Sequence, residues 1–495
     1  MYENIIQQAL AEMVPDYEKI IEKYLEGKDF AVLNTEMKEQ SALLGINIIK
    51  RLIEDINRML RESRERHEKG WYVVKDDARS LLTSLGNVRF ERTLFINHRT
   101  GERAYLTDRM LCLTPGERMT EDAVAQMLEE AAETSYRKGG EACSILGSVS
   151  KETVKEKIHG LVFPREKDLP GVEEKRKCEY LYIEADEDHV SLQFHEKKGD
   201  LKTNENGYKD NTALEKLVYV HEGVEKDSPK GGRNRLINAH YFAGGYPGAE
   251  NNVLAEEIYE YLDRTYDLEK VKKIYLSADG GGWIKGLKDR LPGVTYVLDE
   301  FHMQKYLRKM TGHLLDSAEE AGSELYRLIR KGKKAAFAEY AEVLSSYAEK
   351  ESTVTAVEKG KKYILDNWQA AVTRLNEKDK VYGCSAEGHV SHLLSSRMSS
   401  RPMGWSVSGA DRMARLRAYA KNGYSMLKLV KMQPQAVEAG KAAGAEEMIV
   451  FSAEEVNRWE KQHYKKNGKY FDSIQAGISA ETRKKAWFKA NIREL

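Results

Sequence analysis

The 495-residue sequence predicts an α/β protein built on a mixed sheet that helices cover on both faces. Two observations carry this prediction. Residues 178–306 alternate between strand-like and helix-like segments, and residues 307–380 are almost entirely helix-forming. The first stretch contains three strands, a helix, a strand, a helix and a strand, which is the order of a ribonuclease H-like core. The second is an all-helical insertion, and helical and helix-turn-helix-like regions precede the core.

The amino-acid composition limits the classes of protein to which this chain can belong. Charged residues make up 32% of the chain and hydrophobic residues 41%, which is typical of a soluble, helix-rich protein of several domains. The sequence has no run of about 18 apolar residues and no secretory signal, so we expect no membrane span and a cytoplasmic, nucleoid-associated location. The four cysteines form no C-x-x-C pair, which favours reduced thiols over a zinc site. The formal net charge of zero still allows local basic surfaces.

Two regions are expected before residue 115. Residues 1–70 repeat apolar residues at helical spacing, as in LLGINIIKRLIEDINRML, which predicts amphipathic helices. This region suits either a dimerisation arm or a helical cap. Residues 71–114 contain VRFERTLFI, a turn at NHRTGE and then AYL, which predicts a β-hairpin.

Residues 115–177 predict a helix-turn-helix-like DNA-binding region and a linker. A helix begins at Thr120, two glycines at 139 and 140 interrupt it, and Ser150 caps a final helix. The residues expected to contact DNA belong to that cap and to the helix after it: Ser150, Lys151, Thr153, Lys155 and Lys157. Small helical hairpins of this kind also occur without any DNA-binding role. Residues 163–177 are polar and contain two prolines, so they are expected to form the linker.

Strands within residues 178–306 end in acidic residues. The expected strands are YLYIEAD (180–186), HVSLQF (189–194), KLVYVHEGV (216–224), KKIYLSAD (272–279) and VTYVLD (294–299). Asp186, Asp279 and Asp299 therefore close three of them. Glu387 opens a further helix in GCSAEGHVSHLLSSR. Strand ends and a helix start can bring such distant positions to one edge of a sheet.

Three converging carboxylates favour phosphodiester chemistry with divalent metals. Mg²⁺, for which Mn²⁺ can substitute, prefers oxygen ligands, and two such ions about 3.5–4 Å apart assist both the attacking and the leaving oxygen. Asp186, Asp279 and Glu387 are therefore the predicted metal ligands and catalytic residues. His302 follows Asp299 by three residues and is the fourth catalytic candidate, placed near them.

Each acid also has a purely structural explanation. Asp186 lies in ADEDH, where a hairpin turn favours acids and where Glu184 and Asp188 compete with it for the role. Asp279 precedes three glycines, and Asp-Gly is a common turn. Glu387 lies near a helix start, where the helix dipole favours acids. The glycine run completes neither G-x-G-x-x-G nor a P-loop, so a nucleotide-binding site is not favoured.

Residues 381–432 are expected to contain the last catalytic helix and a basic region. Eight basic residues and one acid lie between Arg397 and Lys431. Arg397, Arg401 and Arg412 are expected to hold phosphates, with an affinity that falls as salt rises. A solvated helix face is the alternative explanation for such a cluster. Residues 433–495 are expected to form a helical, basic tail.

Several of these segments resemble the bacterial insertion-sequence transposases of the ISLre-two type, which are similar to the Mutator-like superfamily of DDE transposases. The resemblance rests on YLSADGGGWIKG, LDEFH and CSAEGHVSHLLSSRMSSRPMGWS, and it extends over most of the chain. It implies a ribonuclease H-like catalytic domain with a helical insertion before the last catalytic helix. It further implies that Asp186, Asp279 and Glu387 form a metal-binding triad, and that Asp299 and His302 match the [C/D]-x-x-H pattern of the superfamily.

The resemblance makes a DNA transposase the first hypothesis. Such a protein would act as a homo-oligomer on DNA, bind the terminal inverted repeats of an insertion sequence, and use Mg²⁺ to cut the element ends and join them to target DNA. One alternative is a non-mobile nuclease on the same fold, which cuts but does not join. The other is a DNA-binding regulator with an inactive catalytic domain.

Overall fold

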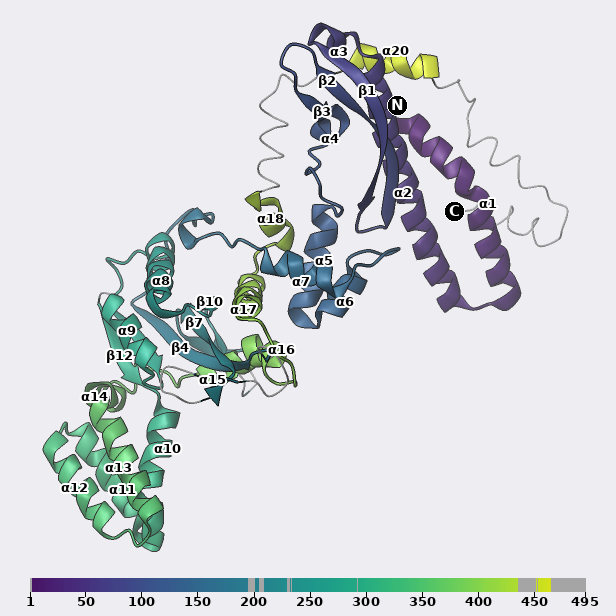
Figure 1. The fold of residues 1–495 in the computed structure, drawn as a ribbon. Coiled ribbons are helices and arrows are strands. Elements are labelled where there is room, and N and C mark those ends of the chain that lie inside the picture. Colours follow the sequence, from purple (N-terminus) through teal and green to yellow (C-terminus); the bar gives the residue numbers. More distant parts are fainter. Residues whose placement is uncertain are drawn as a thin grey trace. The chain divides into compact units, whose positions relative to one another are not determined.

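The computed structural model describes residues 2–194, 201–203, 209–228, 232, 234–291, 293–434, 451 and 453–463. The chain forms two compact units, which are treated separately below (Figure 1). The first contains the described residues of 1–131, 136–154 and 430–495, and the second contains those of 132–135 and 155–429. Among the described helices, none has both the length and the apolar character needed to cross a bilayer.

The first unit contains a three-stranded antiparallel sheet and long helices. Its first elements are α1 (Tyr2–Gly27), α2 (Phe30–Glu62), α3 (Arg64–Glu68), β1 (Trp71–Leu82), β2 (Asn87–Asn97), β3 (Arg103–Tyr105) and α4 (Leu106–Met110). The hairpin expected from VRFERTLFI and AYL forms between β2 and β3, and β1 pairs with the other edge of β2. Ile53, Ile56 and Leu60 of α2 pack with Phe90 and Phe95 of β2, which explains the helical spacing of apolar residues in that segment.

Three helices follow: α5 (Glu121–Glu133), α6 (Tyr136–Ala142) and α7 (Lys151–His159). The expected interruption at Gly139 and Gly140 is wrong, because both glycines lie inside α6. A Cβ on Gly139 would meet the Ala131 Cβ at 2.6 Å, and one on Gly140 would meet the Val149 carbonyl oxygen at 2.3 Å. The two glycines therefore allow close packing of neighbouring backbone instead of ending a helix. Helices α5 and α7 each contain residues of both units.

The second unit is built on a five-stranded mixed sheet with the order β10-β7-β4-β11-β12. Its strands are β4 (Tyr180–Ser191), β7 (Thr212–His221), β10 (His240–Gly244), β11 (Lys273–Ala278) and β12 (Val294–Leu298). β7 runs antiparallel to β4 and to β10, whereas β11 runs parallel to β4 and to β12. The predicted α/β class with a mixed sheet is therefore confirmed.

Two of the predicted strands are placed differently. HVSLQF is not a separate strand, because β4 continues through the acids of ADEDH to Ser191, paired with β7 along the way. The third strand of the sheet is instead β10, which the sequence did not predict. β10 has five residues, all of them buried, so it shows no alternation of apolar and polar side chains. Two short ribbons also form, β5 (Lys202–Thr203) with β6 (Lys209–Asp210) and β8 (Val224–Lys226) with β9 (Asn234–Leu236).

Alternation along β4 gives the sheet two different faces. Leu181, Ile183 and Ala185 belong to an apolar core shared with α8 (Asn251–Thr265) and α9 (Gly282–Arg290). The intervening residues, including Glu184 and Asp186, belong to the opposite face. There α15 (Ala386–Val390) contacts β4, and α17 (Val407–Lys421) contacts β7 and β10. The shorter elements are η1 (Glu166–Asp168), η2 (Gly248–Glu250), the π-helical η4 (Ser391–Ser395), α16 (Ser396–Met398) and α18 (Met426–Lys431).

The segment that follows β12 is a helical bundle with its own core. It consists of α10 (Glu300–Thr311), η3 (Gly312–Ser317), α11 (Ala318–Arg330), α12 (Lys334–Ser346), α13 (Glu351–Asp366) and α14 (Trp368–Asn376). Met310, Leu325, Ile329 and Phe337 are among the residues buried together in this core. Helix α14 contacts β12, so the bundle is joined to the edge of the sheet.

The segment expected to be a linker, residues 163–177, is anchored. Glu166 is buried, with its Oε1 2.8 Å from His240 Nε2, and its Oε2 accepts a hydrogen bond of 2.6 Å from Arg264. A buried carboxylate held by two such partners is costly to remove. The first half of the expected linker is therefore held to the second unit through Glu166.

The predicted helical tail is described only in part. The described portion contains α20 (Ala453–His463), in which Trp459 donates a hydrogen bond of 2.9 Å to Glu62 of α2. The rest of the prediction for residues 433–495 lies outside the described residues.

Candidate active site

Two aspartates lie at the same level on neighbouring parallel strands, Asp186 inside β4 and Asp279 directly after β11. Ala185 of β4 is in register with Ala278 of β11, so Asp186 and Asp279 come next on the two strands. The register continues to β12, after which Asp299 comes next. Because the three strands are parallel and in register, the three acids occupy neighbouring positions across the sheet, although β4 continues beyond Asp186 to Ser191.

Asp186 is partly removed from water and lies close to other negative charge. Burial raises its pKa to about 6, and the charges of Asp279 and Glu187 add to that effect. A hydrogen bond of 2.9 Å from the Glu187 amide to its Oδ1 opposes the rise. Two carboxylates in such a place repel each other, which favours the protonated form of Asp186.

The glycines after Asp279 form a turn that orients its carboxylate. The Gly281 amide donates to Asp279 Oδ1 at 2.9 Å, and the Tyr363 hydroxyl donates to the Asp279 carbonyl oxygen at 2.5 Å. Gly280 has a φ of +98°, and a Cβ there would meet the side chain of Asn367 at 3.0 Å. Glycine is thus required by both conformation and space. Tyr363 belongs to α13 and Asn367 follows that helix, so the helical bundle supports the turn.

Asp299 is the N-cap of α10. Its carboxylate accepts hydrogen bonds from the amides of Phe301 at 3.2 Å and His302 at 3.3 Å, and its Oδ2 lies 2.8 Å from His302 Nδ1. Burial alone would raise the pKa of Asp299, but these hydrogen bonds lower it. The contact with Asp299 raises the pKa of His302, and the charge of Asp279 adds to that. Asp299 therefore anchors His302 near the two other aspartates.

Glu387 is the second residue of α15, and its side chain is exposed. Within the described part of the chain, no three or more His, Cys, Asp or Glu side chains are grouped so that they could hold a metal ion. The structure thus brings Asp186 and Asp279 together but does not add Glu387 to them. Helix α15 nevertheless contacts β4, the strand that contains Asp186.

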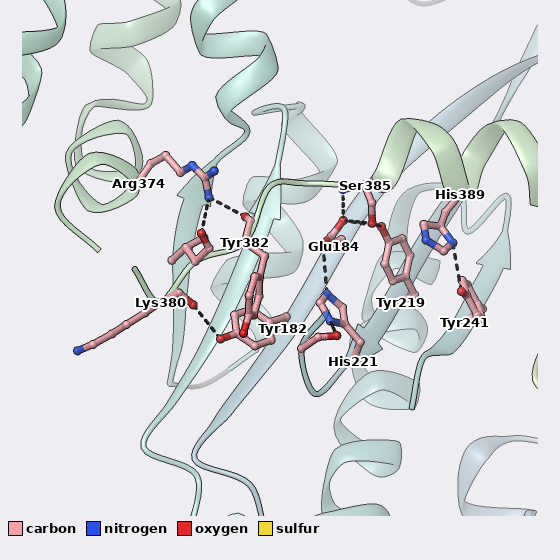
Figure 2. A network of polar contacts seen from close by, with 12 residues as sticks. Tyr182, Glu184, Tyr219, His221, Tyr241, Arg374, Lys380, Tyr382, Ser385 and His389 are labelled. Atoms are coloured by element: carbon pink, nitrogen blue, oxygen red, sulfur yellow. Dashed lines mark hydrogen bonds and ion pairs between the residues drawn. The ribbon is translucent and has the colours of Figure 1, made fainter. Parts of the chain in front are cut away.

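A buried polar network surrounds Glu184 (Figure 2), which by alternation along β4 belongs to the same face as Asp186. Its centre is Glu184, which is 3% exposed. Glu184 Oε2 accepts hydrogen bonds from the Tyr219 hydroxyl and, at 2.6 Å, from the Ser385 amide. Its Oε1 lies 3.2 Å from His221 Nε2. Burial alone would raise the pKa of Glu184, but its contacts with His221, Tyr219 and Ser385 lower it.

The sequence offered Glu184 only as an alternative to Asp186. One signal was available, because a carboxylate between apolar residues inside a strand is buried only when it has partners. The partners themselves come from β7 and from the start of α15, which are remote in sequence.

Comparison with known proteins places the chain in a family. The model described as "Uncharacterised protein family (UPF0236)" matches residues 24–436. The chain belongs to the UPF0236 family. A UPF0236 protein of Caldanaerobacter subterraneus subsp. tengcongensis is 33% identical over 451 residues, which are 91% of this chain and 90% of the relative. A second UPF0236 protein of that organism is 34% identical over 443 residues, or 89% and 88% of the two chains.

Among solved structures, a chain of the Drosophila P element transposase strand transfer complex matches 68% of this UPF0236 chain and 95% of its own length. The sequence identity is 11% and the TM-score is 0.22. A similarity at this level carries no argument about fold or function.

The expected DNA contacts near α7 lie at the start and along the surface of that helix. Ser150 Oγ accepts a hydrogen bond of 3.3 Å from the Thr153 amide, which is an N-cap contact. Lys151 and Lys155 are exposed, and Lys157 is half-buried.

The three arginines expected to hold phosphates differ in exposure. Arg401 is exposed, and Arg412 is half-buried with its guanidinium 3.7 Å from Asp411. Arg397 is 5% exposed, and its guanidinium lies 5.0 Å from the centre of the Trp405 ring. The structure therefore places Arg397 inside the protein, where it packs against an aromatic ring instead of facing solvent.

Proposed function

We propose that this UPF0236 protein is a DNA transposase of a bacterial insertion sequence with a ribonuclease H-like catalytic core. One observation carries the proposal: Asp186 inside β4 and Asp279 directly after β11 lie at the same level of two adjacent parallel strands, and the charge of Asp279 helps to raise the pKa of Asp186. The order of the sheet supports it, since three antiparallel strands are followed by two parallel strands beside the first. In this account the enzyme hydrolyses the phosphodiester at the element end, and the freed 3′-hydroxyl then attacks target DNA.

We assign a divalent cation to the Asp186–Asp279 pair. The donors fit Mg²⁺, which is commonly held by one or two carboxylates and keeps several waters. When bound, the cation supplies charge stabilisation to the reacting phosphate. The Gly281 amide fixes the orientation of Asp279, and Asp299 fixes that of His302. Glu387 is not grouped with the aspartate pair in the structure, and we propose it as the third carboxylate because it is exposed on a helix that contacts β4.

The relatives support a mobile element. The name of the first relative joins eleven locus designations, and that of the second joins four. One coding sequence present at many loci is what repeated insertion leaves in a genome. An enzyme with a fixed metabolic role has no such requirement.

DNA contacts are assigned to exposed cations. Lys151 and Lys155 follow the capped start of α7, and Arg401 follows α16. Cations that neutralise phosphates release counterions, so binding through them weakens steeply with salt. We assign α7 to the terminal inverted repeat and a homo-oligomer to the assembled complex on DNA.

The test is cleavage and joining of an end-labelled duplex made from the DNA that borders the coding sequence. Wild type and Asp279→Asn are compared in Mg²⁺, Mn²⁺ and EDTA. We expect nicked and joined products from the wild type with metal only, and none from the variant. Cutting without joining would replace the proposal by a nuclease, and binding without cutting by either protein would replace it by a regulator.

A further inference from the structure

Glu184 connects three elements of the second unit through one buried carboxylate (Figure 2). It belongs to β4, Tyr219 and His221 belong to β7, and Ser385 is the N-cap of α15. Both carboxylate oxygens are used, Oε1 facing His221 and Oε2 accepting from Tyr219 and Ser385. Hydrogen bonds to a buried charge are among the strongest in proteins, so this contact fixes the elements relative to one another.

His221 has partners on both ring nitrogens. Its Nδ1 lies 3.1 Å from the Gly223 carbonyl oxygen, which can only accept. Its Nε2 faces Glu184 at 3.2 Å, and His221 is fully buried. The ring is therefore held in one orientation between the backbone of the turn after β7 and the carboxylate of Glu184.

The contact with Ser385 concerns the start of a helix. The first amides of a helix have no partner within it and need one from elsewhere. Ser385 donates its amide to Glu184 at 2.6 Å, and its hydroxyl lies 3.1 Å from the same oxygen. Glu184 thus binds the N-terminal end of α15 directly to the strand that contains Asp186, two residues further on.

The rest of α15 and the segment before it are also held. His389 Nδ1 lies 3.1 Å from the Tyr241 hydroxyl of β10, and the Tyr182 hydroxyl donates to the Lys380 carbonyl oxygen at 2.8 Å. Arg374 donates to the Tyr382 carbonyl oxygen at 2.7 Å. Glu184 is the member of this set that joins β4 to the first turn of α15, where Glu387 is located.

We propose that Glu184 is a positioning residue: together with His221 it fixes the start of α15 against β4 and so sets where Glu387 stands relative to Asp186. The proposal rests on the proposed function for the role of Glu387, but the contact itself does not. Glutamine in place of Glu184 keeps one acceptor oxygen where the carboxylate uses two, and it leaves His221 without its charged partner.

The test compares Glu184→Gln with Glu166→Gln in the full chain. Glu166 is a matched control, because it is also a buried carboxylate bonded to a histidine, and its partners His240 and Arg264 lie outside α15. The first readout is amide hydrogen exchange at Ser385 to His389. We expect exchange there to rise about 10-fold or more in Glu184→Gln, from the loss of a charged hydrogen bond, and to stay at the wild-type rate in Glu166→Gln.

The second readout is the rate at which the protein cuts the duplex made from the DNA that borders the coding sequence. Binding of that duplex is measured separately. We expect the cutting rate to fall about 10- to 100-fold in Glu184→Gln while binding is kept, as for other groups that orient catalytic ligands. Unchanged exchange in α15, or an equal rise in both variants, would overturn the proposal. If wild type cuts no duplex, the proposed function fails, and the exchange result still decides whether Glu184 positions α15. If Glu184→Gln does not fold, Ser385→Ala is measured instead, with a smaller rise expected and no rise overturning the proposal.

Discussion

Replacing Glu215 of β7 with glutamine is expected to stabilise the protein at neutral pH. Glu215 is 1% exposed, and its Oε2 has no hydrogen-bond partner. Burial, and then the charge of Asp411, raise its pKa from 4.5 to about 8, with Asp188 adding to the rise and Arg415 opposing it. An acid with a raised folded-state pKa holds its proton more tightly when folded. Its contribution to stability is therefore present below pH 4.5 and is lost as the pH rises to about 8.

The size of the expected stabilisation follows from the proton that Glu215 keeps in the folded state and loses in the unfolded state. At pH 7 the unfolded chain ionises Glu215, whereas the folded chain holds it neutral. Each tenfold change in proton concentration is worth about 1.4 kcal/mol, so keeping the proton at pH 7 rather than 4.5 costs about 3 kcal/mol. Glutamine has nearly the same shape and no charge in either state, so it avoids this cost.

The assay is the free energy of unfolding of wild type and Glu215→Gln from pH 4.5 to 8. We expect the variant to be more stable by about 3 kcal/mol at pH 7 and equal to wild type at the acid end. Glu166→Gln serves as the control, since its carboxylate is paired and its loss is expected to destabilise at pH 7. A Glu215→Gln variant that is less stable at pH 7, or whose advantage does not change with pH, would refute this reasoning.

Three other substitutions test the glycine turn, an exposed cation and a buried arginine. Gly280→Ala is expected to lower the free energy of unfolding by about 1–3 kcal/mol, because φ is +98° and the new Cβ meets Asn367; an unchanged unfolding temperature would contradict the turn described for Asp279. Lys155→Ala is expected to reduce the slope of log affinity for DNA against log salt by about one. Arg397→Ala is expected to lower the unfolding temperature and leave that slope unchanged, since Arg397 is buried against Trp405; the reverse pattern would place Arg397 at the DNA.

The part of the fold that the sequence predicted is the part governed by local pattern. VTYVLD gave β12 and KKIYLSAD gave β11, because each is an apolar run bounded by turn residues. The helix between them explains why β11 and β12 run parallel. The register of β11 with β4 is what sets Asp279 beside Asp186. A strand end followed by a glycine turn was thus enough to find Asp279, whereas Asp186 lies inside β4.

The remainder depends on contacts between residues far apart in the chain. The acids of ADEDH look like a turn, yet β4 runs through them because β7 supplies backbone partners. Glu166 lies in a polar, proline-containing segment, but it is buried because it contacts His240 and Arg264. Arg397 lies in a basic stretch that is typical of an exposed surface, but it is buried and packs against Trp405. In each case a partner from a distant segment overrides the local tendency, and no local pattern identifies that partner.

Mn²⁺ binding shows whether Asp186 and Asp279 form a metal site. Binding is monitored as the decrease in the electron paramagnetic resonance signal of free Mn²⁺. Wild type, Asp186→Asn, Asp279→Asn and Glu166→Gln are titrated under the same conditions. If Asp186 and Asp279 hold the cation together, wild type and Glu166→Gln will bind Mn²⁺, and both aspartate variants will lose that binding. Equal binding by all four proteins would contradict the account, because the cation would then be held elsewhere.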